Sequence, residues 1–158
     1  MADGKKNIYV DMDGVLADFF GETDCVQRFE KERGFFRRLK PLSKNVAAVR
    51  KAIVDGKHNV FVLSASPNSR CDRDKRLWLA KYLPELETEN AIIMRVGENK
   101  TDYMKTPDGI LFDDYGKNIK EWICVNCGLN RAVKVKADGD VAVGLQAINF
   151  FNDIMLNG

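Results

Sequence analysis

Four aspartates and two serines each stand at the end of a short apolar run: Asp11, Asp13, Ser64, Ser66, Asp113 and Asp114. If these runs are neighbouring parallel strands, their carboxyl ends converge on one crevice. Four carboxylates gathered there repel one another unless a cation neutralises them, and an all-oxygen environment suits Mg²⁺. The residue types therefore predict a metal site with Mg²⁺ as the cofactor.

The Asp-x-Asp-Gly spacing of residues 11–14 suits attack on a phosphate ester. Asp11 can attack phosphorus and form an aspartyl-phosphate while Mg²⁺ shields the charge repulsion. Asp13 lies two residues on, on the same side of an extended strand, so it can protonate the leaving oxygen and then activate water. Gly14 lets the chain turn away. A hydroxyl at Ser64 and a lysine from a neighbouring loop would hold the phosphate oxygens.

The elements that must position these residues alternate along the chain. Runs apolar on both faces suit strands of a parallel sheet covered by helices, and they lie at 8–10, 59–63, 91–94 and 110–112. Amphipathic stretches with helical spacing lie between them. The pattern predicts an α/β fold with a doubly wound parallel sheet.

Several element boundaries follow from local signals. Ser43 and Asp72 are suited to cap two helices, Gly56 to close the first, and Pro84 to end the second. Trp78 and Trp122 fall on apolar helix faces and are interpreted as core residues. The alternating stretch 131–136 predicts an edge strand with one wet face. Arg70, Arg73, Lys75 and Arg76 alternate with aspartates, which favours a solvated helix start.

The segment 15–41 interrupts this alternation. It is longer than an ordinary connection between a strand and a helix, and it is rich in aromatic and basic residues. We interpret it as a small, mostly helical cap inserted after the first strand, within a single domain of residues 1–158. Because ligands of open α/β sheets bind at the carboxyl ends of the strands, such a cap can act as a lid.

Composition excludes several other classes. The 158 residues carry 25 Lys+Arg against 23 Asp+Glu, a net charge of +2, which argues against a nucleic-acid polymer as partner. No signal peptide and no membrane span is visible, so the expected localisation is cytoplasmic, without a membrane partner. The one histidine, His58, sits in a turn-like stretch and is expected in a solvated loop. The Cys124/Cys127 pair has no second pair, which favours free thiols.

The stretch 11–19 resembles the first motif of the haloacid dehalogenase (HAD) superfamily phosphatases, in the form found in cytosolic type C 5′(3′)-deoxyribonucleotidases. The similarity continues through Gly34 to Phe36, Ser64 to Pro67, Lys75 to Tyr82 and Ile110 to Asp114, and it covers about residues 7–123. The resemblance implies a HAD-like Rossmannoid core. Two features depart from it: Ser64 to Pro67 has one residue more than the family's Thr-Ser-Pro, and the tail after Cys124 matches nothing.

The resemblance also implies roles for individual residues. Asp11 would be the nucleophile and a metal ligand, and Asp13 the acid/base with its backbone carbonyl on Mg²⁺. Asp114 would bind the metal directly, with Asp113 behind it or acting through water. Ser64, together with Ala65, would bind phosphate.

The lysine of the phosphate site has two candidates, Lys100 and Lys105, of which Lys100 suits the family spacing better. Phe19 and Phe36 would line the substrate pocket, although Phe35 and Phe36 are also suited to pack the cap on itself.

The expected function is therefore a Mg²⁺-dependent phosphomonoesterase of nucleoside monophosphates, with deoxyribonucleotides preferred, acting through an aspartyl-phosphate. The alternatives are a phosphatase for another small metabolite such as a sugar phosphate, or a non-catalytic nucleotide-binding module. The partner is a small-molecule phosphomonoester in either enzymatic reading. The choice between 5′ and 3′ phosphate stays open.

Overall fold

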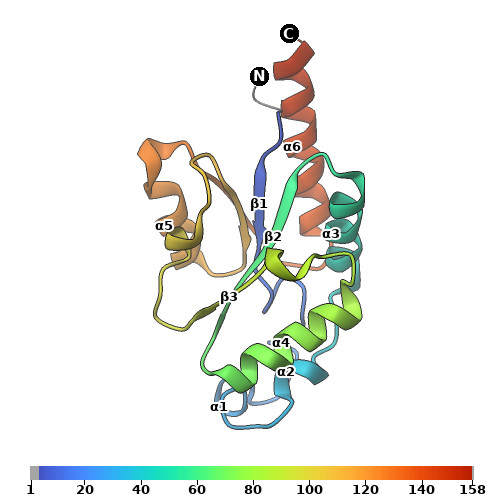
Figure 1. Cartoon of the computed structure of the whole chain (residues 1–158), viewed down its shortest axis with the longest axis vertical. Coiled ribbons are helices and arrows are strands. Elements are labelled where there is room, and N and C mark those ends of the chain that lie inside the picture. The colour runs from blue at the N-terminus through green and yellow to red at the C-terminus, as the bar shows by residue number, and fades with distance from the viewer. Residues whose placement is uncertain (1–3, 158) are drawn as a thin grey trace.

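Five parallel strands form one sheet in the order β3-β2-β1-β4-β5 (Figure 1). The computed structural model describes the backbone of residues 4–157 and the side chains of residues 4–155. The strands are β1 (Asn7–Val10), β2 (Asn59–Ser66), β3 (Ala91–Arg95), β4 (Ile110–Asp113) and β5 (Arg131–Lys134). This confirms the predicted α/β class with a parallel sheet. The edge strand β5 also lies where the alternating pattern predicts it.

The pairing register brings the polar strand ends together. Val10, the last residue of β1, pairs with Val62 of β2 on one side and with Phe112 of β4 on the other. The chain therefore reaches Asp11, Ser64 and Asp113 within one or two residues of the same level of the sheet. The central position of β1 places Asp11 between the two neighbouring strand ends.

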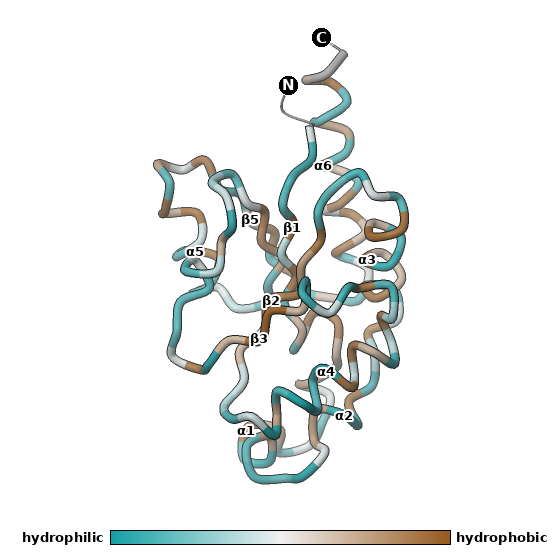
Figure 2. The backbone as a smooth tube through the Cα atoms, in the orientation of Figure 1, coloured by the Kyte–Doolittle hydropathy of each residue, from teal (hydrophilic) through white to brown (hydrophobic). Residues whose placement is uncertain are grey.

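Helices cover both faces of the sheet, which explains why the strands are apolar on both sides. Ile8 and Val10 belong to one buried cluster, whereas Tyr9 belongs to a second cluster with Trp122. Figure 1 shows α5 (Gly116–Cys124) on one side and α3 (Ser43–Asp55) with α6 (Asp140–Asn157) on the other. In Figure 2 the strands are largely hydrophobic and the outer loops hydrophilic.

Two predicted helix caps are wrong by a few residues. Helix α4 (Ser69–Tyr82) begins before Asp72, because the side chain of Asn68 accepts a hydrogen bond from the Cys71 amide (2.9 Å). Ser43 is the first residue of α3 and makes no capping hydrogen bond. Gly56 closes α3 in the left-handed conformation, as predicted. Within the described residues there are also three short 3₁₀ helices: η1 (Thr88–Asn90), η2 (Lys100–Tyr103) and η3 (Asn126–Gly128).

The segment 15–41 is less helical than predicted. It contains two four-residue helices, α1 (Cys25–Arg28) and α2 (Phe35–Arg38), and turns elsewhere. The residues before them, Asp24 and Gly34, have positive φ values of 53° and 72°, so neither helix extends backward along the chain. The segment lies at the carboxyl end of the strands beside α4 (Figure 1), where a lid is expected.

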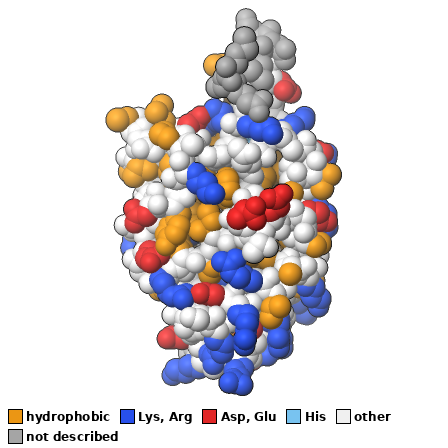
Figure 3. Space-filling model, in the orientation of Figure 1, with side chains coloured by type: hydrophobic (Ala, Val, Ile, Leu, Met, Phe, Trp, Pro, Cys, Tyr) orange, Lys and Arg blue, Asp and Glu red, His pale blue; other side chains and the backbone are white. Residues whose placement is uncertain are grey.

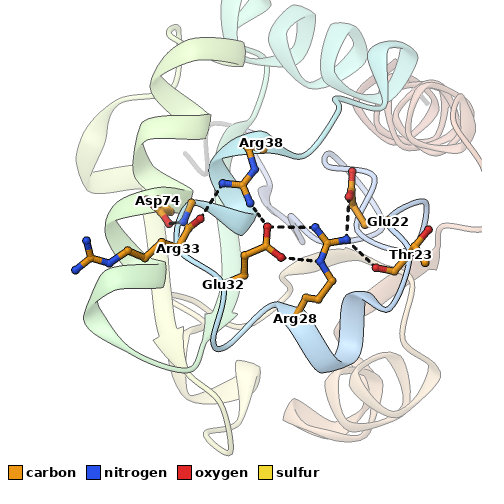
Figure 4. Close-up of polar contacts among 8 residues, drawn as sticks. Glu22, Thr23, Arg28, Glu32, Arg33, Arg38 and Asp74 are labelled. Atoms are coloured by element: carbon orange, nitrogen blue, oxygen red, sulfur yellow. Dashed lines mark hydrogen bonds and ion pairs between the residues drawn. The ribbon is translucent and has the colours of Figure 1, made fainter.

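The cap segment is held by an aromatic cluster inside and an ion-pair network outside. Inside, the rings of Phe19, Phe29, Phe35 and Phe36 pack on one another at centroid distances of 5.5 to 6.2 Å. Outside, Glu32 accepts hydrogen bonds from Arg28 (2.6 Å) and from Arg38 (Figure 4). Trp78 of α4 donates to the Leu39 carbonyl (2.8 Å), and the Gly34 amide donates to Asp74 (3.1 Å). These bonds fasten the cap to the core.

His58 is not in a solvated loop, so that prediction is wrong. Its side chain is buried, accepts a hydrogen bond from the Lys6 amide (3.2 Å) and pairs with Asn149 of α6 (2.8 Å). His58 lies in the bend directly before β2, and its imidazole joins this bend to α6. The histidine therefore has a structural role, far from the strand ends that carry the aspartates.

Positive charge is concentrated at one end of the surface (Figure 3), although the net charge is only +2. Lys and Arg side chains gather over the end of the molecule where α1, α2 and α4 lie (Figure 3). All four cysteines are free thiols, and Cys25 and Cys71 are buried. Among the described residues, no helix has the length and hydropathy needed to cross a membrane.

Candidate active site

The carboxylates of Asp11, Asp113 and Asp114 form a compact cluster at the carboxyl edge of the sheet. One oxygen of each lies within 4.8 Å of the others. Asp11 follows β1, and its amide donates to the Phe112 carbonyl of β4 (2.9 Å), so the two strand ends are fixed to each other. Asp113 is fully buried. A set of hard oxygen donors at this spacing fits a divalent cation such as Mg²⁺.

The electrostatics of the cluster favour a bound cation. Burial raises the pKa of Asp11 well above its usual range, and the charges of Asp113, Asp13 and Asp114 raise it further against the opposing effect of Lys100. Burial and the charge of Asp113 also raise the pKa of Asp114, to about 6. Both shifts mean that the metal-free fold disfavours the ionised carboxylates. A divalent cation would remove much of that cost.

Mg²⁺ is expected to raise the melting temperature of the metal-free protein more at about pH 7.5 than at about pH 5. Because the pKa values of Asp11 and Asp114 are raised in the fold, the folded state binds more protons than the unfolded state. This contribution stabilises the metal-free fold progressively as the pH falls through about 6, the pKa of Asp114. Protons then compete with Mg²⁺ for the same oxygens.

Thermal unfolding with and without Mg²⁺ at both pH values checks this expectation. The rise in melting temperature on adding Mg²⁺ should shrink at the lower pH. The same rise at both pH values would contradict it.

Gly14 allows the Asp114 carboxylate to approach the first loop. Its φ is +79°, and a Cβ added there would lie 2.2 Å from Oδ2 of Asp114. The amides of Leu16 and Ala17 both donate to the Met12 carbonyl, which closes a tight loop after β1. Position 14 therefore requires glycine for two reasons: its backbone is left-handed, and the Asp114 carboxylate occupies the space of a side chain.

Gly14→Ala is expected to cost about 1–2 kcal/mol of stability through backbone strain and also to displace Asp114. Gly56→Ala is the matched control, since Gly56 has a φ of +64° but no atom within 4 Å of an added Cβ. Urea unfolding should therefore show a loss in both variants, whereas only Gly14→Ala should lose the stabilisation by Mg²⁺. If Mg²⁺ stabilises Gly14→Ala as much as the wild-type protein, Gly14 is not needed to make space for the Asp114 carboxylate.

Lys100 is the lysine that reaches the carboxylate cluster. Its buried ammonium lies 3.0 Å from Asp11 Oδ1 and 2.7 Å from Asp113 Oδ2. Burial disfavours its charge, but Asp11 and Asp113 outweigh that effect and raise the pKa of Lys100. Lys105 instead places its ammonium over the Phe61 ring, 4.7 Å from the centroid, in the apolar cluster on one face of the sheet. Of the two candidates, only Lys100 contacts the carboxylate cluster, and its role as a phosphate ligand stays a prediction.

Lys75 contacts two of the candidate site residues, Asp13 and Ser64, and the sequence does not single it out. The charged stretch around Lys75 predicts a solvated helix start, and this prediction is wrong, because the side chain is fully buried. Its ammonium donates to Asp13 Oδ2 (2.5 Å), to Ser64 Oγ (2.9 Å) and to the Ala65 carbonyl (2.7 Å). The helical spacing of Lys75 with Cys71, four residues before it, and Trp78, three residues after it, marks it as part of the buried face of α4. That spacing is the signal that could have found it.

The predicted pocket residues Phe19 and Phe36 lie within the aromatic cluster of the cap. Phe19 is 8% and Phe36 2% exposed, and their rings stack at 6.2 Å. Their role in the substrate pocket stays a prediction. A groove of about 420 Å³ opens beside Asp114, lined in part by Phe20 and Lys134, and the sequence alone does not mark either residue as part of a pocket. Phe20 is 65% exposed, so its ring is available to a ligand.

A parallel sheet with paired aspartates at the carboxyl ends of β1 and β4 is the core of the HAD superfamily, as the sequence resemblance implies. The fold agrees with a solved structure described as "Structure of Pnkp1/Rnl/Hen1 complex", with a TM-score of 0.60. That match covers 82% of this chain and 45% of the other, at 17% identity, so it shows the fold alone.

Residues 22–139 match the sequence profile of the family described as "5′ nucleotidase, deoxy (Pyrimidine), cytosolic type C protein". The chain belongs to this family. It is also 32% identical over 90 residues to a protein of Vibrio phage KVP40 named "Putative 5′(3′)-deoxyribonucleotidase". That alignment covers 50% of this chain and 52% of the phage protein, so the chain matches about half the length of this relative. The profile match begins after Gly14, and the placement of Asp11 and Asp13 therefore rests on the geometry above.

Proposed function

We propose that the protein is a Mg²⁺-dependent phosphomonoesterase that hydrolyses nucleoside monophosphates, with deoxyribonucleotides preferred. The observation that carries this proposal is the buried cluster of Asp11, Asp113 and Asp114 with Lys100 against it. A nucleophile, a cation site and a fixed positive charge then lie within one polar centre. Membership of the type C nucleotidase family supports the nucleotide as the substrate class and agrees with a cytoplasmic location.

The proposed reaction has two steps. A carboxylate oxygen of Asp11 attacks phosphorus and the ester bond breaks, while Asp13 gives its proton to the departing oxygen. Water then attacks the aspartyl-phosphate and returns a proton to Asp13, so inorganic phosphate leaves and both aspartates are restored. Lys100 and the Ser64 hydroxyl hold the phosphate oxygens, with Ala65 at the same turn of the chain.

Asp11, Asp114 and the backbone carbonyl of Asp13 would hold the metal directly, and Asp113 would lie behind them or act through water. When bound, Mg²⁺ would offset the repulsion between the Asp11 carboxylate and the phosphate. Asp113 is well suited to a supporting position, because it also accepts hydrogen bonds from the Tyr115 amide (2.8 Å) and from Asn118 (3.0 Å). These donors fix its orientation within the cluster.

We assign substrate selection to the cap segment, residues 15–41, and to the groove beside it. The basic side chains over this end of the molecule (Figure 3) would attract an anionic ester. Phe19 and Phe36 remain proposed pocket residues, and the exposed ring of Phe20 is a further surface on which a base can stack.

Phosphate release from a substrate panel tests the function. The panel holds deoxyribonucleoside and ribonucleoside 5′- and 3′-monophosphates and several sugar phosphates, each assayed with and without Mg²⁺. Mg²⁺-dependent release that is fastest from deoxyribonucleotides is the expected result. Release from sugar phosphates alone would change the substrate class, and binding of nucleotides without any release would favour a non-catalytic module.

A further inference from the structure

We propose that Lys75 is a positioning residue that holds Asp13 for proton transfer to and from the leaving group. The inference rests on the proposed function and concerns a residue that neither the first motif nor the Asp113-Asp114 pair contains. Lys75 lies on α4, 62 residues from Asp13 in the chain, and its ammonium contacts the Asp13 carboxylate at 2.5 Å.

The three hydrogens of the Lys75 ammonium are all used within the protein. Asp13 Oδ2, Ser64 Oγ and the Ala65 carbonyl accept them at 2.5 to 2.9 Å. No donor of Lys75 is therefore left for a phosphate oxygen. The Ser64 hydroxyl accepts from Lys75 and so keeps its own hydrogen for the substrate. Lys75 is therefore placed to act through Asp13 and Ser64. Lys100, in contrast, contacts Asp11, the proposed nucleophile.

The two oxygens of Asp13 are in different situations. Oδ2 is held by Lys75, whereas Oδ1 is buried and has no hydrogen-bond partner among the described residues. A buried oxygen without a partner is costly and seldom retained without a use. With one oxygen anchored, the other is held in a fixed direction, as a group that must give and take a proton requires.

The cap segment closes the remaining side of Lys75. The ring of Phe36 covers the ammonium, with Nζ 4.3 Å from the ring centroid. This contact shields the Lys75 ammonium from water, because both Phe36 and Lys75 are almost completely buried. The Asp13 side chain remains 23% exposed, on the side where a substrate would approach. The cap is thereby linked to the acid/base group as well as to the substrate pocket.

The test compares two substrates whose leaving groups differ in their need for a proton. A deoxyribonucleoside 5′-monophosphate releases an alkoxide that must be protonated, whereas p-nitrophenyl phosphate releases a stable phenolate. Lys75→Met should lower kcat/KM for the nucleotide at least about tenfold more than for p-nitrophenyl phosphate, since general acid catalysis contributes about 10²–10⁴-fold. Loss of the Ser64 contact would lower both values alike. Lys81→Met, on the exposed side of the same helix, should change neither.

A double-mutant cycle with Asp13→Asn tests whether Lys75→Met changes the ratio of the two kcat/KM values through Asp13. In the Asp13→Asn background, Lys75→Met should no longer alter the ratio between the two substrates. Lys75→Gln keeps a donor on a shorter side chain and replaces Lys75→Met if circular dichroism shows that the methionine variant does not fold. An equal loss for both substrates, or an undiminished effect without Asp13, would overturn the inference. Failure of the proposed function is a separate outcome, because the wild-type protein would then release no phosphate.

Discussion

Replacing Asp11 by asparagine is expected to reduce phosphate release at least about 10⁴-fold, the scale of loss when a covalent nucleophile is removed. The amide cannot form the aspartyl-phosphate, and neither Asp13 nor Lys100 can replace it. The fold should survive, since burial and three neighbouring carboxylates already raise the pKa of Asp11 and make its charge unfavourable there. Steady-state phosphate release measures the loss of activity in the variant, and circular dichroism measures whether its fold is retained.

Asp55→Asn is the matched control for this variant. Asp55 is an exposed carboxylate at the end of α3, so the same chemical change there should leave both activity and fold unaltered. If Asp11→Asn keeps near-normal turnover, Asp11 is not the nucleophile. If it unfolds, its carboxylate has a structural role that the electrostatics do not indicate.

Removing divalent metal is expected to stop turnover and to lower the melting temperature. Adding Mg²⁺ at about 100 times its dissociation constant should restore about 2.7 kcal/mol of stability. For a chain of this size that corresponds to a rise of about 5–10 °C. The physical reason is the carboxylate cluster, in which one oxygen of each of three aspartates lies within 4.8 Å of the others. Activity and thermal unfolding after treatment with a chelator, then with Mg²⁺, measure the effect.

Asp113→Asn separates a specific metal site from general salt effects. This variant should lose the thermal response to Mg²⁺, whereas Asp55→Asn should keep it. Turnover that is unchanged by the chelator would contradict the proposed metal dependence, whatever happened to stability.

The positions of the aspartates were predictable from the sequence because they depend on local signals. An apolar run followed directly by a carboxylate fixes both the strand and the edge at which the side chain lies, as at Asp11 and Asp113. The parallel arrangement then brings strand ends from distant parts of the chain together. The choice of Lys100 over Lys105 also agrees with the geometry, since residue spacing before β4 determines which lysine reaches the crevice.

Other features depend on contacts that a single sequence does not reveal. The charged residues around Lys75 predict that it is exposed. Its burial follows instead from the packing of α4 between β2 and the cap. His58 is buried because α6, about 90 residues later, supplies Asn149 as its partner. In the cap, residues 24 and 34 adopt positive φ values that break the helical pattern, and such turns are only weakly encoded.

The most direct test of the central claim is to trap the phosphorylated protein. The wild-type protein is mixed with Mg²⁺ and a deoxyribonucleoside monophosphate, quenched in acid within the first turnover, digested and examined by mass spectrometry. The account predicts one phosphoryl group on the peptide that contains Asp11, and none on that peptide from Asp11→Asn. Continued phosphate release with no phosphorylated peptide at any quench time would contradict an aspartyl-phosphate mechanism.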